Sequence, residues 1–413
     1  MQNLTIDARR LWDSLMETAR IGGTAKGGIC RLTLTDLDRE VRDWFRAQVE
    51  ALGCRITVDE VGNMFAFRPG RRSDVAPIAI GSHLDTQPTG GKFDGVLGVL
   101  GGLEALRTLH DLGYETNAPL MLVNWTNEEG SRFAPAMLGS GVYAGVFDRT
   151  FADSREDRQG VRFADALEAI GYRGNAPAGS VPFGAMFELH IEQGPILEAE
   201  EKMIGVVTGV QGMRWYEIEL TGCESHASTP MHLRHNALLG AARVVERVDA
   251  IANRHAPIAV GTVGLMEVNP NSRNVVPAHV FLAVDLRHPD DSVLELMERE
   301  LCEAVPAMAR EIGLELVTRK VWDSPAVRFD PECIAAVRAG VARAGFPTRD
   351  IVSGAGHDAA CIARVAPTTM IFVPCAGGLS HNEAESTTFD ECAAGAQVLL
   401  NAVLEYDRRF AAP

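Results

Sequence analysis

The sequence lacks an apolar run long enough to cross a membrane. No stretch approaches the roughly 18 consecutive apolar residues that indicate a transmembrane helix, so we expect no membrane partner. Near the N-terminus, Leu11, Leu15 and Ala19 recur at helical spacing, but charged residues interrupt the run. This pattern predicts a surface helix and not a signal peptide.

Cysteines in the C-x-x-C spacing are also absent. The eight cysteines are scattered along the chain. Without a secretory signal, this distribution favours reduced thiols in a cytoplasmic protein.

Basic residues are scarce. The chain has 39 Lys and Arg against 55 Asp and Glu, which gives a net charge of -16. A nucleic-acid-binding protein normally carries a basic face, so we expect no nucleic-acid partner. The hydrophobic share of 46% is ordinary for a globular enzyme, and a length of 413 residues favours two domains.

Short apolar runs alternate with helical patterns in the outer parts of the chain. This alternation predicts an α/β fold with parallel strands. Strands are expected at 77–83, 119–125, 185–191 and 368–374, and helices at 95–113 and about 389–408.

The middle of the chain has a different pattern. Strand-like runs at 214–222, 258–268, 279–288 and 314–322 and helical runs at 236–253 and about 291–312 follow in the order β-α-β-β-α-β. This order is typical of a small ferredoxin-like α+β unit. We therefore predict that 213–329 is a domain inserted into a larger one formed by 1–212 and 330–413.

Potential metal ligands stand at or just beyond the ends of the apolar runs in the larger domain. Ligands in an open α/β sheet collect outside the carboxyl ends of the strands, so these side chains could meet in one crevice. Each one alone has an ordinary structural explanation, as a hydrogen-bonded histidine, a solvated glutamate pair or a turn. Together they favour a divalent metal site with imidazole and carboxylate ligands. They are His83, Asp94, Glu128, Glu129, His190 and His381.

The adjacent Glu128 and Glu129 can have two different roles. Neighbouring residues in extended backbone project in opposite directions, so one can bind a metal while the other acts as a general base. Asp85 follows His83 by two residues. We expect its carboxylate to orient that histidine, and the alternative is a cap of a helix or turn.

The motifs in which these residues lie resemble the M20-type amidases. The resemblance is to the hydantoinase/carbamoylase branch, which includes N-carbamoyl-L-amino acid hydrolases, allantoate amidohydrolases and β-ureidopropionases, and it runs from about residue 10 to about 405. It implies a metallo-aminopeptidase-like catalytic domain with a mixed sheet and an inserted lid and dimerisation domain. The motifs are H-L-D-T (83–86), G-x-x-D-G ending at Gly95, N-E-E-G-S-R-F (127–133), H-I-E-Q-G-P-I-L-E (190–198) and S-H-N-E-A-E (380–385).

The resemblance also implies roles for the ligands. Two divalent ions per chain are expected, chosen from zinc, manganese, cobalt and nickel, with Asp94 bridging them. Glu128 is expected to be the general base. The first ion would be held by His83, Asp94 and His190, and the second by Asp94, Glu129 and His381.

Substrate-binding residues are implied in both domains. Gln193 and Gly356 would contact the substrate, and His226 would stabilise the transition state. Asn274 and Arg287 would bind a substrate carboxylate. The guanidinium of Arg287 can form two parallel hydrogen bonds to it. A salt bridge at the end of a strand is the alternative for Arg287.

Two further segments bear on the roles assigned to these residues. The His226 segment reads H-A-S-T-P-M, where relatives usually have H-A-G-x-x-P-M, so this loop departs from the family pattern. In GAGHDA (354–359), His357 and Asp358 are expected to support the site without binding metal.

These observations predict hydrolysis of the terminal ureido group of an N-carbamoyl-L-amino acid to the amino acid, ammonia and carbon dioxide. The alternatives are an allantoate amidohydrolase or β-ureidopropionase, a dipeptidase or aminopeptidase, and a metal-binding homologue without activity. The substrate is expected to be a small carboxylate. The family resemblance further implies a homodimer formed by 213–329, with His226, Asn274 and Arg287 reaching the site across the dimer.

Overall fold

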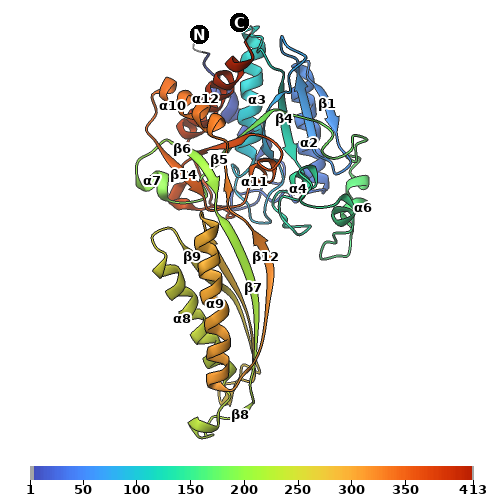
Figure 1. Ribbon diagram of the computed structural model, residues 1–413. Helices are drawn as coiled ribbons and strands as arrows, with labels where there is room; N and C mark the ends of the chain where they lie inside the picture. Colours follow the sequence, from blue (N-terminus) through green and yellow to red (C-terminus); the bar gives the residue numbers. More distant parts are fainter. Residues whose placement is uncertain (1–3, 412–413) are drawn as a thin grey trace. The chain divides into compact units, whose positions relative to one another are not determined.

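A computed structural model describes residues 4–411 (Figure 1). The chain forms two compact units: one comprises the chain up to Gly209 and again from Arg328 onward, and the other is Val210–Val327. None of the helices in the described part of the chain is long and apolar enough to span a membrane.

A mixed sheet lies at the centre of the larger unit. Its strands are β1 (Arg55–Val58), β2 (Met64–Arg68), β3 (Ile78–His83), β4 (Leu120–Trp125), β5 (Ala185–Ile191), β6 (Ile204–Val210), β13 (Val327–Arg328), β14 (Thr348–Ser353) and β15 (Thr368–Val373). The strand order is β1-β2-β4-β3-β5-β15-β6-β13, with β14 paired to β6. The central strands β4, β3, β5 and β15 run parallel, β1 and β2 pair antiparallel with their neighbours, and β6 pairs antiparallel with β15. The predicted mixed α/β sheet is confirmed.

Helices and short helical turns surround this sheet. They are α1 (Ala8–Thr18), α2 (Asp36–Ala51), α3 (Val96–Asp111), α4 (Leu138–Tyr143), α5 (Arg149–Asp153), α6 (Phe163–Ala169), α7 (Ile196–Ala199), α10 (Pro331–Ala344), α11 (Asp358–Ile362), α12 (Phe389–Asp407), η2 (Ala376–Gly378) and η3 (Arg408–Phe410).

The glycines in α3 allow that helix to lie close to the sheet. A Cβ atom on Gly98 would lie 2.3 Å from the carbonyl oxygen of Leu189 in β5 and 2.6 Å from the Cβ of Ser82 in β3. Helix α3 therefore packs directly on β3 and β5, and α12 packs beside it on β5 and β15. This close packing places the start of α3, and Asp94 just before it, at the carboxyl end of β3.

The other face of the sheet carries its own apolar cluster. An aromatic group lies at its centre, with Tyr143 5.2 Å from both Trp125 and Phe183 between ring centroids. Ile362 of α11 covers part of the same face. The buried members of the cluster are Phe65, Ala79, Met121, Val123, Trp125, Phe183, Met186, Ile362 and Ala366.

The smaller unit is built on a four-stranded antiparallel sheet with the order β12-β7-β11-β9. Two helices pack against it, and the long elements follow in the order β-α-β-β-α-β. The elements are β7 (Gly212–Thr221), α8 (Ala237–Arg254), β9 (Val260–Asn269), β11 (His279–His288), α9 (Asp291–Ile312) and β12 (Glu315–Ser324), with a short pair β8 (Ser225–His226) and β10 (Val275–Val276) and the turn η1 (Met231–Leu233).

Burial alternates along β11. Val280, Leu282, Val284 and Leu286 are buried and pack beneath α8 and α9. The residues between them point to the opposite face of the sheet, as the two-residue period of a strand requires. Arg287 belongs to that second face.

Candidate metal centre

Four neighbouring parallel strands deliver the predicted ligands to one edge of the large sheet. His83 ends β3, and His190 is the last residue but one of β5. Glu128 and Glu129 follow β4, and His381 follows β15 in the chain. The carboxyl ends of parallel strands meet at one edge, so the side chains converge although they are far apart in sequence.

The first candidate ligand group consists of His83, Asp94 and His190, all buried. Oδ1 of Asp94 lies 3.6 Å from Nε2 of His83 and 3.1 Å from Nε2 of His190. Nδ1 of His83 donates to the carbonyl of Asp85, and Nδ1 of His190 donates to the carbonyl of Ile191, each at 2.9 Å. These bonds fix both rings and leave Nε2 as the atom that faces Asp94.

The second candidate group consists of Asp94, Glu129 and His381. Nε2 of His381 lies 3.5 Å from Oδ2 of Asp94 and 3.3 Å from Oε2 of Glu129. The His381 side chain is half exposed, whereas the two carboxylates are buried. Asp94 therefore faces one group with Oδ1 and the other with Oδ2, which is the arrangement of a bridging carboxylate.

The chemistry of these side chains fits divalent cations. Burial opposes a charge on His83, but the nearby carboxylates of Glu128 and Asp94 outweigh it and raise the pKa of His83 well above its ordinary value. Burial and the charge of Asp94 raise the pKa of Glu129 in turn. Within residues 4–411, Nε2 of His83 is also a buried polar atom without a hydrogen-bond partner. A metal ion would supply both the missing partner and the positive charge that the carboxylates favour.

Glu128 lies in neither ligand group. Its Oε2 is 3.4 Å from Nε2 of His83, and burial raises the pKa of Glu128 well above its ordinary value. Glu129 contacts His381 instead. The two glutamates thus face different parts of the centre.

Asp85 supports the centre by a different route from the predicted one. Its backbone carbonyl, and not its carboxylate, accepts the bond from His83. The carboxylate lies 3.8 Å from that nitrogen and instead accepts from the backbone N–H groups of Glu128 and Glu129, each at 3.3 Å. Asp85 follows a strand and its carboxylate reaches the next loop, so it positions both glutamates at once.

Gln193 contacts the shared carboxylate. Its side-chain amide donates to Oδ2 of Asp94 at 2.7 Å and to the hydroxyl of Ser380 at 3.3 Å. Gln193 has a φ of 55°, an uncommon value for a residue other than glycine, and His381 has a φ of 54°. Such outliers gather at functional sites, where the surrounding structure holds the backbone in place.

Sequence reasoning missed Ser380 and Glu385. The Ser380 hydroxyl lies 2.8 Å from Oδ2 of Asp94 and 2.9 Å from Oε2 of Glu385. Glu385 also accepts from the backbone N–H groups of Phe93 and Asp94, each at 3.1 Å. One hydroxyl proton cannot serve two carboxylates, and burial together with Asp94 raises the pKa of Glu385 to about 7, which favours a proton on Glu385. Both residues lie in the S-H-N-E-A-E stretch, which was the available signal.

A third group of possible ligands lies behind His190. It consists of Glu188, His190 and His357. Glu188 already accepts from the Ser82 hydroxyl at 2.7 Å and from the backbone N–H of Ala359, while Nε2 of His357 lies 2.9 Å from the Ser353 hydroxyl. Because protein groups satisfy these side chains, they support His190, whose ring centroid is 4.6 Å from that of His357.

Two other predicted residues of this region have plain structural contacts. A Cβ atom on Gly356 would lie 3.0 Å from the Met137 side chain, so the backbone at this glycine is closely packed. Asp358 is buried and bonds to the Ser140 hydroxyl at 2.5 Å.

The remaining predicted residues lie in the smaller unit. His226 is in β8, and its backbone neighbour Ala227 donates to the carbonyl of Asn274 at 2.9 Å. Arg287 is near the end of β11, where its guanidinium pairs with Asp285 at 2.8 Å. The structure thus brings His226 and Asn274 together and places Arg287 elsewhere on the sheet.

Comparisons with known proteins show similarity over nearly the whole chain. Residues 79–405 match the family model described as Peptidase family M20/M25/M40. An N-carbamoyl-L-amino-acid amidohydrolase of Rhizobium meliloti is 52% identical over 405 residues, covering 98% of this chain and 97% of that protein. An allantoate amidohydrolase of Bacillus subtilis is 32% identical, covering 92% and 93%. The crystal structure of a hydantoinase/carbamoylase family amidase from Burkholderia multivorans is 56% identical, has a TM-score of 0.94 and covers 98% of each chain.

Proposed function

The chain belongs to peptidase family M20/M25/M40, as its motifs indicated, and we propose that it hydrolyses the terminal ureido group of N-carbamoyl-L-amino acids. The products are the amino acid, ammonia and carbon dioxide. One observation carries the proposal: two ligand groups share Asp94, and Glu128 stands beside them without belonging to either.

We propose that each ligand group holds one divalent ion. His83, Asp94 and His190 hold the first, and Asp94, Glu129 and His381 hold the second. Two ions held in this way would polarise the carbamoyl carbonyl and lower the pKa of a bound water molecule. Zinc, manganese, cobalt and nickel all suit such imidazole and carboxylate ligands.

Glu128 acts as the general base and then as the general acid. It takes a proton from the attacking water as the oxygen adds to the carbamoyl carbon, and it returns that proton to the nitrogen that leaves as the C–N bond breaks. The carbamic acid that remains loses carbon dioxide. The carboxylate of Asp85 accepts a hydrogen bond from the backbone N–H of Glu128 and so keeps Glu128 in place.

The smaller unit supplies groups for the substrate. We propose that Arg287 and Asn274 bind the substrate carboxylate and that His226 stabilises the transition state. Arg287 is eight residues from His279 along β11, which is about 27 Å in an extended strand. His226 and Asn274 lie beyond the His279 end of the sheet, where Figure 1 shows β8.

This separation changes the expectation for the dimer. One small substrate cannot contact both ends of one sheet, so the three residues cannot all come from the same copy. We propose that the chain uses its own Arg287 and that His226 and Asn274 reach the site from the partner copy. The family resemblance had implied that all three residues cross the dimer.

The smaller unit also has the surface that a homodimer needs. Strand β9 is at the edge of the sheet, and large apolar side chains are exposed on it and on α8. An apolar edge strand of this kind favours pairing with a second copy. These exposed side chains are Leu238, Leu239, Val245, Val260, Leu265 and Met266.

Allantoate is the second candidate substrate, because an allantoate amidohydrolase matches nearly the whole chain. Allantoate also carries terminal ureido groups and one carboxylate, so the same site chemistry would serve it. A homologue without activity would have no need of a buried carboxylate beside the ligands, so the retained Glu128 argues against that alternative.

A substrate panel tests the proposal. Protein supplied in turn with manganese, zinc, cobalt and nickel is incubated with N-carbamoyl-L-methionine, N-carbamoyl-β-alanine, allantoate and a dipeptide. The proposal predicts the highest kcat/KM for N-carbamoyl-L-methionine, with the ureido substrates followed as ammonia release and the dipeptide as release of its amino acids. Faster turnover of allantoate, or cleavage of the dipeptide alone, would overturn it.

A further inference from the structure

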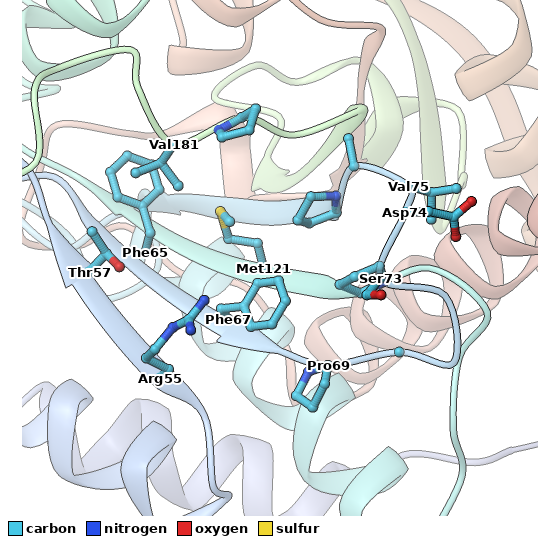
Figure 2. Close-up of a pocket in the computed structure, with 15 residues that line it drawn as sticks. Arg55, Thr57, Phe65, Phe67, Pro69, Ser73, Asp74, Val75, Met121 and Val181 are labelled. Carbon is cyan, nitrogen blue, oxygen red and sulfur yellow. The ribbon is translucent and has the colours of Figure 1, made fainter.

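The larger unit has a cavity at the opposite ends of the central strands from the candidate metal ligands. It lies where Pro77 and Pro119 lead into β3 and β4, and its volume is about 530 Å³ (Figure 2). Sites for small molecules commonly have volumes of about 300–1,000 Å³. Nothing in the proposed reaction uses this cavity.

The register of three strands builds an apolar floor. Phe67 in β2 stands opposite Arg55 in β1 and Met121 in β4, and Phe65 stands opposite Thr57. Residues directly opposite one another point to the same face of a sheet, so the five side chains form one surface. Figure 2 shows the rings of Phe65 and Phe67 on either side of Met121.

The walls of the cavity are rigid. Prolines 69, 77, 119 and 182 line it, and each has a fixed φ. The carbonyl of Pro119 accepts from Ile78 at 2.9 Å and that of Pro77 accepts from Gly184 at 2.8 Å. A cavity that is already formed costs little ordering free energy when a ligand binds.

Arg55 gives the cavity a positive charge. Its guanidinium carbon lies over the Phe67 ring, 5.1 Å from the ring centre. In residues 4–411 no carboxylate pairs with Arg55, although the nearby Arg72 pairs with Asp74 at 2.5 Å. Asp74 also lines the cavity, but Arg72 offsets its charge. The net result is an apolar floor beside one cation.

We propose that this cavity binds a small monocarboxylate with an apolar body. Its carboxylate pairs with Arg55, because a guanidinium binds carboxylates through parallel hydrogen bonds. Its apolar body packs on Phe65, Phe67 and Met121. Such a ligand would act as an effector or as a store, since the cavity and the metal ligands lie at opposite ends of β3 and β4.

Binding can be read at the Met121 methyl group. Protein labelled with ¹³C at methionine methyls is titrated with 3-phenylpropionate and, separately, with its neutral amide of the same shape. The Met121 signal, assigned with Met121→Leu, is expected to shift saturably with the acid at up to about 10 mM, and the amide is expected to bind about tenfold more weakly, or 1.4 kcal/mol. Reading Met121 separates this site from carboxylate binding at the proposed Arg287.

Three variants complete the test. Arg55→Met removes the charge but keeps the apolar stem, and it should weaken binding of the acid about tenfold while ammonia release stays unchanged. Arg71→Met makes the same change on an exposed arginine outside the lining and should bind as the wild type does. Ala76→Trp fills the cavity from an exposed lining position and should abolish the shift. The proposal fails if Met121 does not shift, if acid and amide bind equally, or if Arg55→Met binds as well as the wild type.

Discussion

The orientation of Asp94 depends on neighbours that bind no metal themselves. Ser380 and Gln193 both contact its Oδ2, and Glu385 holds its backbone N–H. Both ligand groups share Asp94, so a small rotation of this carboxylate would disturb both at once.

Ser380→Ala should therefore weaken metal binding. The loss of the hydroxyl frees Asp94 to turn, and removal of such a supporting partner typically lowers metal affinity about 10–100-fold. Competition with a chromogenic chelator measures the change. Ser386→Ala, on an exposed serine of the same stretch, is the control and should bind as the wild type does. Equal affinity in both variants would show that Ser380 does not position Asp94.

Glu128→Gln should keep its metal and lose most of its activity. Glutamine has nearly the same shape but cannot accept the proton of water, and loss of a general base lowers the rate about 10²–10⁴-fold. Activity and metal content are measured on one preparation. Glu168→Gln, on an exposed helical residue, should leave both unchanged. A near wild-type kcat at full metal content would remove Glu128 from the mechanism.

The sequence could locate the residues of the candidate ligand groups but not the groups that hold them in place. His83, His190 and the glutamates were predictable because each ends or follows an apolar run, and the ends of parallel strands converge. Glu385 could not be predicted, because its bonds to the backbone of Phe93 and Asp94 join positions almost 300 residues apart and leave no periodic pattern.

At the scale of elements, the position of Asp94 depends on how closely α3 approaches the sheet. Gly98→Ala should disturb this packing, because its Cβ would lie 2.3 Å from the backbone oxygen of Leu189, which cannot rotate away. Overpacking of this kind costs about 1–3 kcal/mol in the free energy of unfolding.

Chemical denaturation measures the effect of Gly98→Ala. Gly184→Ala is the matched control, since a Cβ atom there would come no closer than 3.4 Å to its neighbours, an ordinary contact distance, and it should leave the unfolding midpoint almost unchanged. Equal midpoints for the two variants would mean that α3 can shift away from the sheet at little cost.

Element length did not decide what could be predicted, because the 16-residue helix α2 was not expected whereas the six-residue strand β3 was. The strand expected at 185–191 is β5, and the helix expected at 291–312 is α9, with the same bounds. No strand was predicted at β1 or β14, because they are half-exposed and show no continuous apolar run. The strand order of the sheet could not be read either, since pairing depends on contacts between distant segments.

At the scale of the whole molecule, mixed dimers test whether two copies share one site. Inactive His226→Ala and inactive Glu128→Gln chains are mixed and reassembled. The site with an intact Glu128 then receives an intact His226 from the partner, so ammonia release should return to about half of the wild-type value per mixed dimer, since one of the two sites is complete.

A second pair of variants separates the two ends of the smaller unit's sheet. Mixing Arg287→Ala with Glu128→Gln should restore no activity, because each chain is proposed to use its own Arg287. Native mass spectrometry verifies that mixed dimers form in both cases. Recovery in the Arg287 mixture, or none in the His226 mixture, would contradict the proposed sharing.

The most direct test of a two-metal hydrolase is a metal titration of activity. Protein stripped with a chelator receives manganese in increments, and bound metal and ammonia release from N-carbamoyl-L-methionine are measured on each sample. Two ligand groups that share Asp94 predict no activity without metal and a rise that ends at about two bound ions per chain. Full activity in the stripped protein, or a maximum reached with only one ion bound, would contradict the two-metal site.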